Sequence, residues 1–228
     1  MNLSTIKRFL LENEHINKIC ASLYRMGGNK VKKRGNSVVY NNTYLSRCTI
    51  SISGQNNQII FNGTNYFKRC KFYITGNNNC IVIGDKVCGY DATFIIEDSN
   101  GIIEVGYKTL FTGKIEVACT EGAIISIGQE CLFSSDVDIR NGDSHSIFNE
   151  NGKRINKAEN IIIGDNVWIG HRVIFLKGAV IGCNSVIGAG AVVTRKFTNP
   201  NVAIGGNPAK IIKEHVCWEH ERLCNTPK

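Results

Sequence analysis

The chain has 228 residues, of which 43% are hydrophobic and 20% charged, a composition typical of a folded protein with one large domain or two small ones. It contains 31 Ile, 26 Asn and 23 Gly but only 3 Pro, which favours many short β-strands joined by tight turns and excludes a helical bundle. The net charge of +8 predicts a solubilising surface or attraction to an anionic partner. Because Lys30–Arg34 is the only dense basic run, nucleic acid is not expected as that partner.

Residues 1–40 precede any repeat and are expected to form an N-terminal helical segment. Ser4 is a candidate N-cap, and apolar residues follow it at roughly helical spacing. Gly27 and Gly28 end the pattern, so the helix is expected to stop there.

The N-terminal residues do not predict a secretory signal. The basic pair Lys7-Arg8 is followed by only three apolar residues before Glu12. No segment approaches the roughly 20 apolar residues of a membrane-spanning helix. The ten cysteines include no C-x2-C pair, which argues against a zinc ribbon. We therefore expect a cytoplasmic protein with reduced, mostly buried cysteines.

From residue 41 onward the chain repeats itself every 22 residues. Thr43–Gly63 aligns with Asn65–Asp85 without a gap, so that Tyr44 falls on Tyr66. Two apolar columns continue the offset: Phe61, Ile83, Val105 and Ile127, and Ile52, Ile74, Ile96 and Ala118. This periodicity predicts four turns of a solenoid, in which each repeat stacks on its neighbours.

The C-terminal half repeats with a shorter period of six residues. Large apolar side chains recur at Ile163, Ile169, Phe175, Ile181, Ile187 and Val193. Small or β-branched residues follow at the fourth position: Val167, Val173, Ala179, Ser185 and Ala191. A period of six matches neither a helix nor a plain strand, but it fits a coil with three flat faces that each send one apolar side chain into a narrow prism. Three hexads make one coil, and the 22-residue coil adds a four-residue excursion at a turn.

One long insertion interrupts this solenoid. After Ile127 the next coil is expected at residue 149, but the matching motif begins at Ile163, which is 14 residues later. The extra residues fall at about 143–158, and a long loop in a regular solenoid is usually functional.

The repeats also define the predicted organisation of the chain. We expect a β-helix over residues 41–200 that contains the inserted loop, followed by a C-terminal cap over residues 201–228. Within the cap, residues 209–223 are expected to form a short helix that covers the open end of the prism.

The run Ile163–Lys213 contains VWIG, IGAGAVVTR and GGNPAKIIK, and a loop with Asp-Ser-His precedes it. It resembles the hexapeptide-repeat acyltransferases, most closely the maltose/galactoside and capsular-polysaccharide O-acetyltransferases. The resemblance covers residues 80–213 well and leaves out residues 1–40. It implies an all-β solenoid, a left-handed parallel β-helix with short N- and C-terminal helical segments. It also implies a homotrimer with active sites between subunits.

The resemblance implies an O-acetyltransferase that moves acetyl from acetyl-CoA to a hydroxyl of a polysaccharide or of its sugar precursor. The basic charge suggests an acidic glycan, such as polysialic acid. Such a transfer needs a general base and an N–H donor for the oxyanion, but neither a metal nor a covalent enzyme intermediate. The helical substrate domain of the maltose and galactoside enzymes is not recognisable, so their acceptors do not carry over.

Two residues are expected to be catalytic by resemblance. His145 lies in the inserted loop, where the family places its catalytic histidine, and is the expected base. Trp168 is too large to point into the prism and is expected beside the acetyl group and the pantetheine arm. The alternative for Trp168 is lateral packing between subunits.

The expected cofactor residues follow Trp168 along the chain. The backbones of Gly170, His171 and Ala189 are expected to line the pantetheine slot, since His171 and Ala189 are 18 residues apart and stack on one face. The family usually has a small residue in place of His171. The residues expected to meet the phosphates of the adenine nucleotide are Thr194, Arg195 and Lys213.

Three other functions use similar sequences. N-acetylation of an amino sugar would differ in the acceptor alone. A hexapeptide carbonic anhydrase needs three zinc-binding histidines, but His145 and His171 lie 26 residues apart without a close pair. A non-catalytic solenoid with an ice-binding face would use the Asn pairs that recur in two coils, Asn56-Asn57 and Asn77–Asn79, and would leave His145 and Trp168 unexplained.

Overall fold

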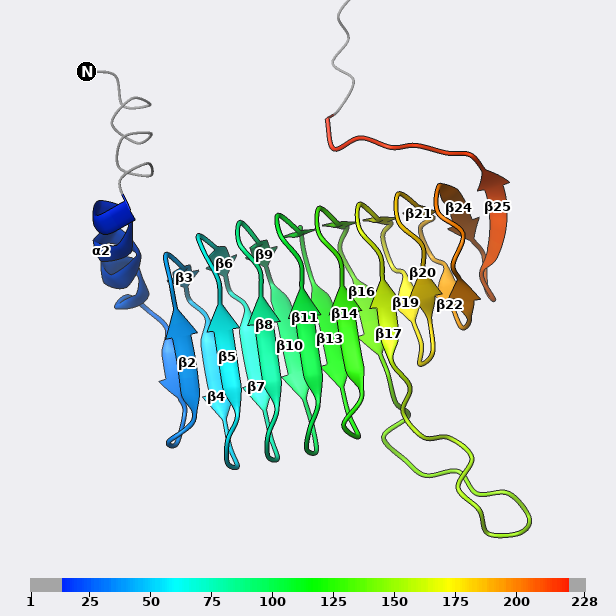
Figure 1. Cartoon of the computed structure of the whole chain (residues 1–228), viewed down its shortest axis with the longest axis horizontal. Helices are drawn as coiled ribbons and strands as arrows, with labels where there is room; N and C mark the ends of the chain where they lie inside the picture. The colour runs from blue at the N-terminus through cyan, green and yellow to red at the C-terminus, as the bar shows by residue number, and fades with distance from the viewer. Residues whose placement is uncertain (1–13, 222–228) are drawn as a thin grey trace, which may run out of the picture.

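The structure, a computed structural model of the chain, describes residues 14–221. Within those residues the chain forms a parallel β-solenoid with one helix at its N-terminal end (Figure 1). The predicted all-β solenoid is confirmed. Ser4 and the N-terminal part of the predicted helix lie outside the described residues.

Three sheets run the length of the solenoid, and each forms one face of a prism. Sheet A contains β1 (Lys30–Lys32), β4 (Thr49–Ile52), β7 (Lys71–Ile74), β10 (Ala92–Ile96), β13 (Ile115–Cys119), β16 (Val137–Arg140), β19 (Ile174–Phe175) and β22 (Val192–Val193). Sheet B contains β2 (Ser37–Tyr40), β5 (Gln58–Phe61), β8 (Cys80–Ile83), β11 (Ile102–Val105), β14 (Ile124–Ile127), β17 (Ile161–Ile163), β20 (Val180–Ile181) and β23 (Lys196–Phe197). Sheet C contains β3 (Tyr44–Ser46), β6 (Tyr66–Lys68), β9 (Cys88–Tyr90), β12 (Leu110–Phe111), β15 (Leu132–Phe133), β18 (Trp168–Ile169), β21 (Val186–Ile187), β24 (Val202–Gly205) and β25 (Lys210–Glu214).

The chain visits the sheets in the order A, B, C in every coil, so it turns at three corners. We call them the A/B, B/C and C/A corners. Each corner lies opposite the third sheet, and this arrangement fixes where a residue points once its corner is known.

The apolar columns of the sequence point into the prism. All six large residues of the hexads and all five small or β-branched residues that follow them are at most 2% exposed. In the N-terminal coils, Phe61 pairs with Ile83 and Val105 with Ile127 in sheet B. Ile127 then pairs with Ile163, as the predicted 14-residue insertion requires. The period therefore identified the core correctly.

One position of the predicted columns is wrong. Ile96 pairs with Cys119 and not with Ala118, which is paired with Ile95 and faces outward. The cause is one extra residue at the C/A corner before β13: Ala92 pairs with Ile115, at an offset of 23, whereas the strands of sheet C keep the offset of 22.

Buried asparagines hold the A/B corners of the N-terminal coils together. The Asn79 side chain donates to the carbonyl oxygens of Thr75 (3.1 Å) and Asp98 (2.9 Å) and accepts from the Gly101 amide (2.8 Å). Asn57, one coil earlier, accepts from the Asn79 amide (2.9 Å). Both are 1% exposed, so one member of each recurring Asn cluster serves the fold and does not present a surface array.

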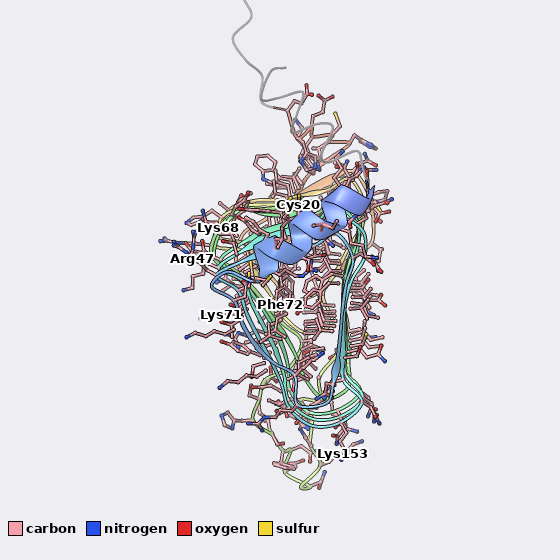
Figure 2. All side chains as sticks on the ribbon, turned by 90° about the vertical axis from the view of Figure 1, so that its left-hand side faces the viewer. Cys20, Arg47, Lys68, Lys71, Phe72 and Lys153 are labelled. Atoms are coloured by element: carbon pink, nitrogen blue, oxygen red, sulfur yellow. The ribbon has the colours of Figure 1, made fainter. Side chains whose placement is uncertain are left out.

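The N-terminal helix, α2 (Glu14–Arg25), covers the first coil and packs on β3, as seen end-on in Figure 2. The Tyr24 ring meets the Tyr44 ring edge-on at 5.6 Å, and Arg25 donates to the carbonyl oxygen of Thr43 (2.6 Å). Strands β1 and β2 already pair in sheets A and B, so the solenoid begins at Lys30, before the boundary expected at residue 41.

The C-terminal cap is extended, and the predicted helix over residues 209–223 is wrong for the part that the structure describes. β24 continues sheet C parallel to β21, and β25 reverses to pair antiparallel with β24. A strand pairs with the open edge of the last coil, which a helix cannot do. The chain then turns back as an extended strap, residues 216–221, toward earlier coils (Figure 1).

All nine cysteines of the described residues are unpaired. Burial raises the pKa of Cys131 to about 12 and that of Cys119 to about 11, so both are protonated thiols at neutral pH. Within residues 14–221, no helix has the length and apolar content needed to cross a membrane.

Candidate functional site

The two predicted catalytic residues lie on opposite sides of the prism. His145 belongs to the inserted loop, which connects β16 to β17 at the A/B corner and extends away from the solenoid (Figure 1). Trp168 lies in β18 of sheet C, the face opposite that corner. Within one chain the loop therefore does not fold back over Trp168, contrary to what their separation in the sequence suggests.

Asn156 organises the base of the inserted loop. Its side-chain amide is 5% exposed, donates to the Asp143 carboxylate (2.9 Å) and the His145 carbonyl (2.7 Å), and accepts from the Ile147 amide (2.7 Å). The His145 amide also donates to the Asp143 carbonyl (2.7 Å). These bonds fix the His145 backbone and leave its side chain exposed.

Two ion pairs attach the loop to the prism. Lys177 pairs with Asp143, and Arg154 pairs with Glu121. The hydrogen bond from Lys177 lowers the pKa of Asp143, and the hydrogen bond from Arg154 lowers the pKa of Glu121. Both carboxylates are thus charged at neutral pH and committed to the loop. The Asp143 carboxylate is directed at Lys177 and Asn156.

Trp168 faces outward from sheet C, because its neighbour Ile169 fills the prism. Its side chain is 40% exposed, and its ring lies 6.0 Å from that of Trp218 in the strap. A cleft of about 440 Å³ opens beside the two indoles. Its other lining residues are Thr112, Leu132, Ser134, Glu219, His220 and Glu221.

Gly170, His171 and Ala189 lie together at the C/A corner, in consecutive coils, as expected. The Gly170 amide donates to the Ile187 carbonyl (2.8 Å), and the Gly190 amide donates to the His171 carbonyl (2.8 Å). A Cβ on Gly170 would come within 2.7 Å of the Ala189 amide nitrogen. Glycine is therefore required at position 170 for the stacking of the coils themselves.

The His171 ring is turned toward the preceding coil. Its Nδ1 lies 2.9 Å from the Ser135 carbonyl oxygen and 3.0 Å from the Ser135 hydroxyl. Because a carbonyl oxygen only accepts, Nδ1 carries the proton and donates. Its Nε2 faces the Asp136 carboxylate at 3.8 Å. The coil length across the insertion is 36 residues, so this offset from His171 would have identified Ser135 in the sequence.

The three residues expected at the phosphates do not gather in one place within the chain. Thr194 and Arg195 lie at the A/B corner between β22 and β23, whereas Lys213 lies in β25 at the edge of sheet C. The Arg195 guanidinium donates to the Ala209 carbonyl (3.4 Å) and lies over the Phe197 ring, 5.2 Å from its centroid. All three are exposed at the C-terminal end of the solenoid.

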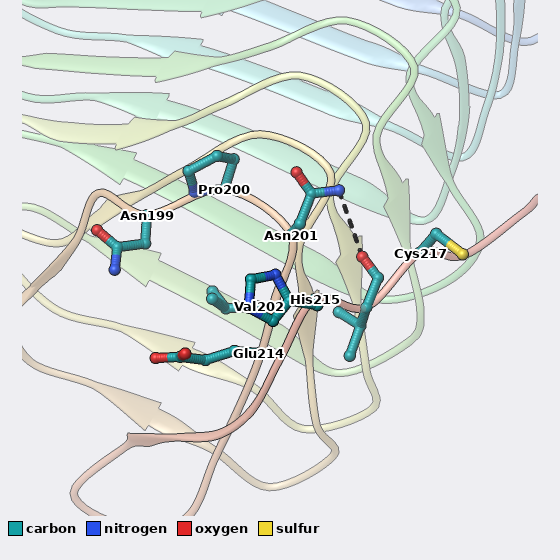
Figure 3. Close-up of a pocket in the computed structure, with 8 residues that line it drawn as sticks. Asn199, Pro200, Asn201, Val202, Glu214, His215 and Cys217 are labelled. Atoms are coloured by element: carbon teal, nitrogen blue, oxygen red, sulfur yellow. Dashed lines mark hydrogen bonds between the residues drawn. The ribbon is translucent and has the colours of Figure 1, made fainter.

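The strap forms a second cleft, of about 540 Å³, where it leaves β25 (Figure 3). Residues 214–217 face the turn 199–202 at the B/C corner. The Asn201 side chain donates to the Val216 carbonyl (3.3 Å), and the Val216 amide donates to the Asn201 carbonyl (2.9 Å). These two bonds anchor the strap. The described part of the chain has no group of three or more His, Cys, Asp or Glu residues arranged to hold a metal.

The sequence and the structure are similar to those of known transferases. Residues 160–195 match the family described as "Bacterial transferase hexapeptide (six repeats)". The polysialic acid O-acetyltransferase OatWY has a solved structure that matches with a TM-score of 0.79 and 31% identity, over 87% of this chain and 94% of that one. The polySia-specific acetyltransferase NeuO matches with a TM-score of 0.79 and 29% identity, over 87% and 92%.

Matches to curated sequences are shorter. The galactoside O-acetyltransferase of Escherichia coli K12 is 52% identical over 54 residues, which are 24% of this chain and 26% of that protein. The first three curated relatives are matched over 26%, 27% and 42% of their own lengths. The high local identity is therefore confined to part of each curated protein.

Proposed function

Since this chain belongs to the hexapeptide-repeat acyltransferases, we propose that it transfers an acetyl group from acetyl-CoA to a hydroxyl of an acidic glycan, of the polysialic acid type. The observation that carries the proposal is the match of 87% of the chain to two acetyltransferases whose names specify polysialic acid. The net charge of +8 supports an anionic acceptor as well as an anionic cofactor.

In this proposal His145 is the general base. It takes the proton of the acceptor hydroxyl while the oxygen attacks the thioester carbonyl, and the proton then passes to the departing CoA thiolate. A positioned histidine contributes about 10²–10⁴-fold to such a step. The bonds of Asn156 and the Lys177–Asp143 pair support this role, because they hold the backbone of an exposed imidazole at a defined height above the A/B corner.

The cofactor is proposed to lie along the C/A corner. Gly170, His171 and Ala189 present small side chains or backbone there, and Trp168 lies in the same coil as Gly170. Thr194, Arg195 and Lys213, which follow at the C-terminal end, are proposed to meet the phosphates. Acetyl-CoA would then run from the last coils toward Trp168, with the thioester beside the indole.

We propose that the working form is a homotrimer, because His145 and Trp168 of one chain lie on opposite sides of the prism. A loop that cannot reach sheet C of its own chain can reach that of a neighbour. The outer face of sheet B supports self-association, since it is largely apolar over six coils. Its outward apolar residues include Ile60, Val82, Ile102, Ile124, Ile162 and Val180. The unpaired cysteines support the cytoplasm as its compartment.

The experiment that tests the reaction is thiol release from acetyl-CoA in the presence of oligosialic acid, a neutral glycan or an amino sugar. We expect turnover with oligosialic acid and at least a 100-fold loss of kcat in His145→Ala, with unchanged CoA affinity. Turnover that survives in His145→Ala removes this residue from the mechanism. Turnover with the amino sugar alone replaces O-acetylation by N-acetylation.

A mixing experiment tests the shared site. His145→Ala and Trp168→Ala are each expected to be inactive, and mixed subunits should regain activity at roughly a quarter of their interfaces after refolding at equal amounts. No recovery in proven hybrids would place the whole site within one chain.

A further inference from the structure

Trp168 is held by a chain of contacts that the C-terminal strap supplies. The Trp218 ring lies 6.0 Å from the Trp168 ring and 4.6 Å from the His220 ring. The Trp218 Nε1–H donates to the Asn166 carbonyl (2.8 Å), and His220 Nε2 lies 3.0 Å from the Glu130 carbonyl oxygen, to which it donates. The strap is thus anchored to two successive coils, and Trp218 has one fixed position beside Trp168.

The cleft between the strap and sheet C has the composition of a small-molecule site. Leu132 and the two indoles supply apolar surface, and the hydroxyls of Thr112 and Ser134 lie on the sheet. The strap adds the carboxylates of Glu219 and Glu221. Its volume of about 440 Å³ lies within the range of roughly 300–1,000 Å³ that such sites occupy.

The order of the coils places this cleft on one side of Trp168 and the cofactor residues on the other. β18 pairs with β15, and β15 pairs with β12, so Leu132 and Thr112 lie one and two coils toward the N-terminus. Ala189 and the residues proposed to meet the phosphates lie toward the C-terminus. A thioester at Trp168 would separate the cofactor from the cleft.

From this geometry, and resting on the proposed function, we propose that the cleft is the subsite for one sugar ring of the acceptor, with Trp168 and Trp218 as its aromatic walls. The C–H face of a pyranose packs on an indole, whose large apolar surface suits it. Sugar hydroxyls donate to the carboxylates of Glu219 and Glu221 and exchange hydrogen bonds with Thr112 and Ser134. The two carboxylates repel the acidic group of the same sugar, so the ring binds with its hydroxyl-bearing part inside and its carboxylate outside.

The chain offers a direct optical test, because Trp168 and Trp218 are its only tryptophans. Sialic acid trimer is titrated into the full-length protein without acetyl-CoA while tryptophan emission is recorded. We expect a saturable change in the parent, about a tenfold higher Kd in Trp218→Ala, and a Kd within about threefold of the parent in Trp218→Phe. Tyr107→Ala, an exposed aromatic residue outside the cleft, is the control and should bind as the parent does.

Kinetics provide the second measurement. Trp218→Ala should raise KM for the glycan about tenfold and leave KM for acetyl-CoA within about twofold. If Trp218→Ala does not fold, the exposed pair Glu219→Gln and Glu221→Gln should weaken trimer binding by about fivefold. Unchanged trimer binding in the folded variants, or an equal rise of both KM values in Trp218→Ala, overturns the subsite.

The two proposals fail in different ways. Saturable binding of the trimer that Trp218→Ala weakens, without acetyl transfer to any glycan, would retain the sugar subsite and reject the transferase. Normal turnover with an unchanged glycan KM in Trp218→Ala would retain the transferase and reject the subsite.

Discussion

Lys177 donates a hydrogen bond to the Asp143 carboxylate and so ties the first residue of the inserted loop to the coil that follows the loop. The same carboxylate oxygen accepts from Asn156, whose side chain also holds the His145 carbonyl. The position of His145 thus depends on a charge that lies in a different coil. This relationship makes the loop sensitive to both mutation and pH.

We expect Lys177→Ala to loosen the loop without unfolding the solenoid. Amide hydrogen exchange over residues 145–156 should accelerate at pH 7, while the strands keep their protection. The proposed acetyl transfer should slow by about tenfold in kcat, because the general base loses its position. Lys153→Ala, at the exposed tip of the loop, is the matched control. Equal exchange in both variants would show that the Asp143 pair does not hold the loop.

The lowered pKa of Asp143 predicts the direction of the pH effect. A carboxylate with a folded-state pKa below its ordinary value stabilises the docked loop above that ordinary value, and the effect is lost as pH falls through the lowered pKa. Glu121, with a pKa lowered by Arg154, acts in the same sense. Loop protection, corrected for intrinsic exchange, should therefore persist from pH 7 to about 4 and fall below about pH 3. Protection that decreases steadily between pH 7 and 5 would contradict this assignment.

Ile169→Asp should strongly destabilise the solenoid. Ile169 is fully buried in the prism, and an unpaired carboxylate there costs several kcal/mol, about 4 or more, in the free energy of unfolding. Ile174→Asp is the control, because Ile174 is 36% exposed and faces outward, and its effect should stay below about 1 kcal/mol. Chemical denaturation of both variants decides the matter, and similar midpoints would reverse the assigned faces.

Asn79→Ala should cost about 3 kcal/mol, because it leaves buried carbonyls of Thr75 and Asp98 and the Gly101 amide without their side-chain partner. Asn78→Gly is a suitable control: Asn78 is exposed and has φ of 58°, which glycine adopts without strain. Urea denaturation should separate the two variants clearly. A stable Asn79→Ala would mean that the asparagine ladder does not hold the corners.

Arg195→Ala and Lys213→Ala should each weaken CoA binding by about three- to tenfold, if these cations meet the phosphates as proposed. The loss should be largest at low salt, since screening weakens the parent's ionic contacts as well. Lys71→Ala, in the N-terminal coils, is the control. Calorimetric titration of CoA at two salt concentrations measures the effect, and unchanged affinity in both variants would assign the phosphates to other residues.

Several features followed from the sequence alone because they are local and repeated. A period of six or 22 residues states which side chain of each coil points inward, and in-register stacking enforces that choice in the next coil. The inward positions of Ile163 and Ile169, the buried hexads and the site of the insertion were predicted for this reason. The slip at Ala118 escaped because a single extra residue at one corner leaves the rest of the column unchanged.

Only the tertiary structure decided what the non-repeating segments do. The antiparallel pairing of β25 depends on the open edge of β24, and the contact between Trp218 and Trp168 depends on where the strap then runs. The placement of His145 and Trp168 on opposite sides depends on which corner carries the loop. Periodicity gives the coil of a residue, whereas contacts between a cap, a loop and distant coils arise from packing that no repeat encodes.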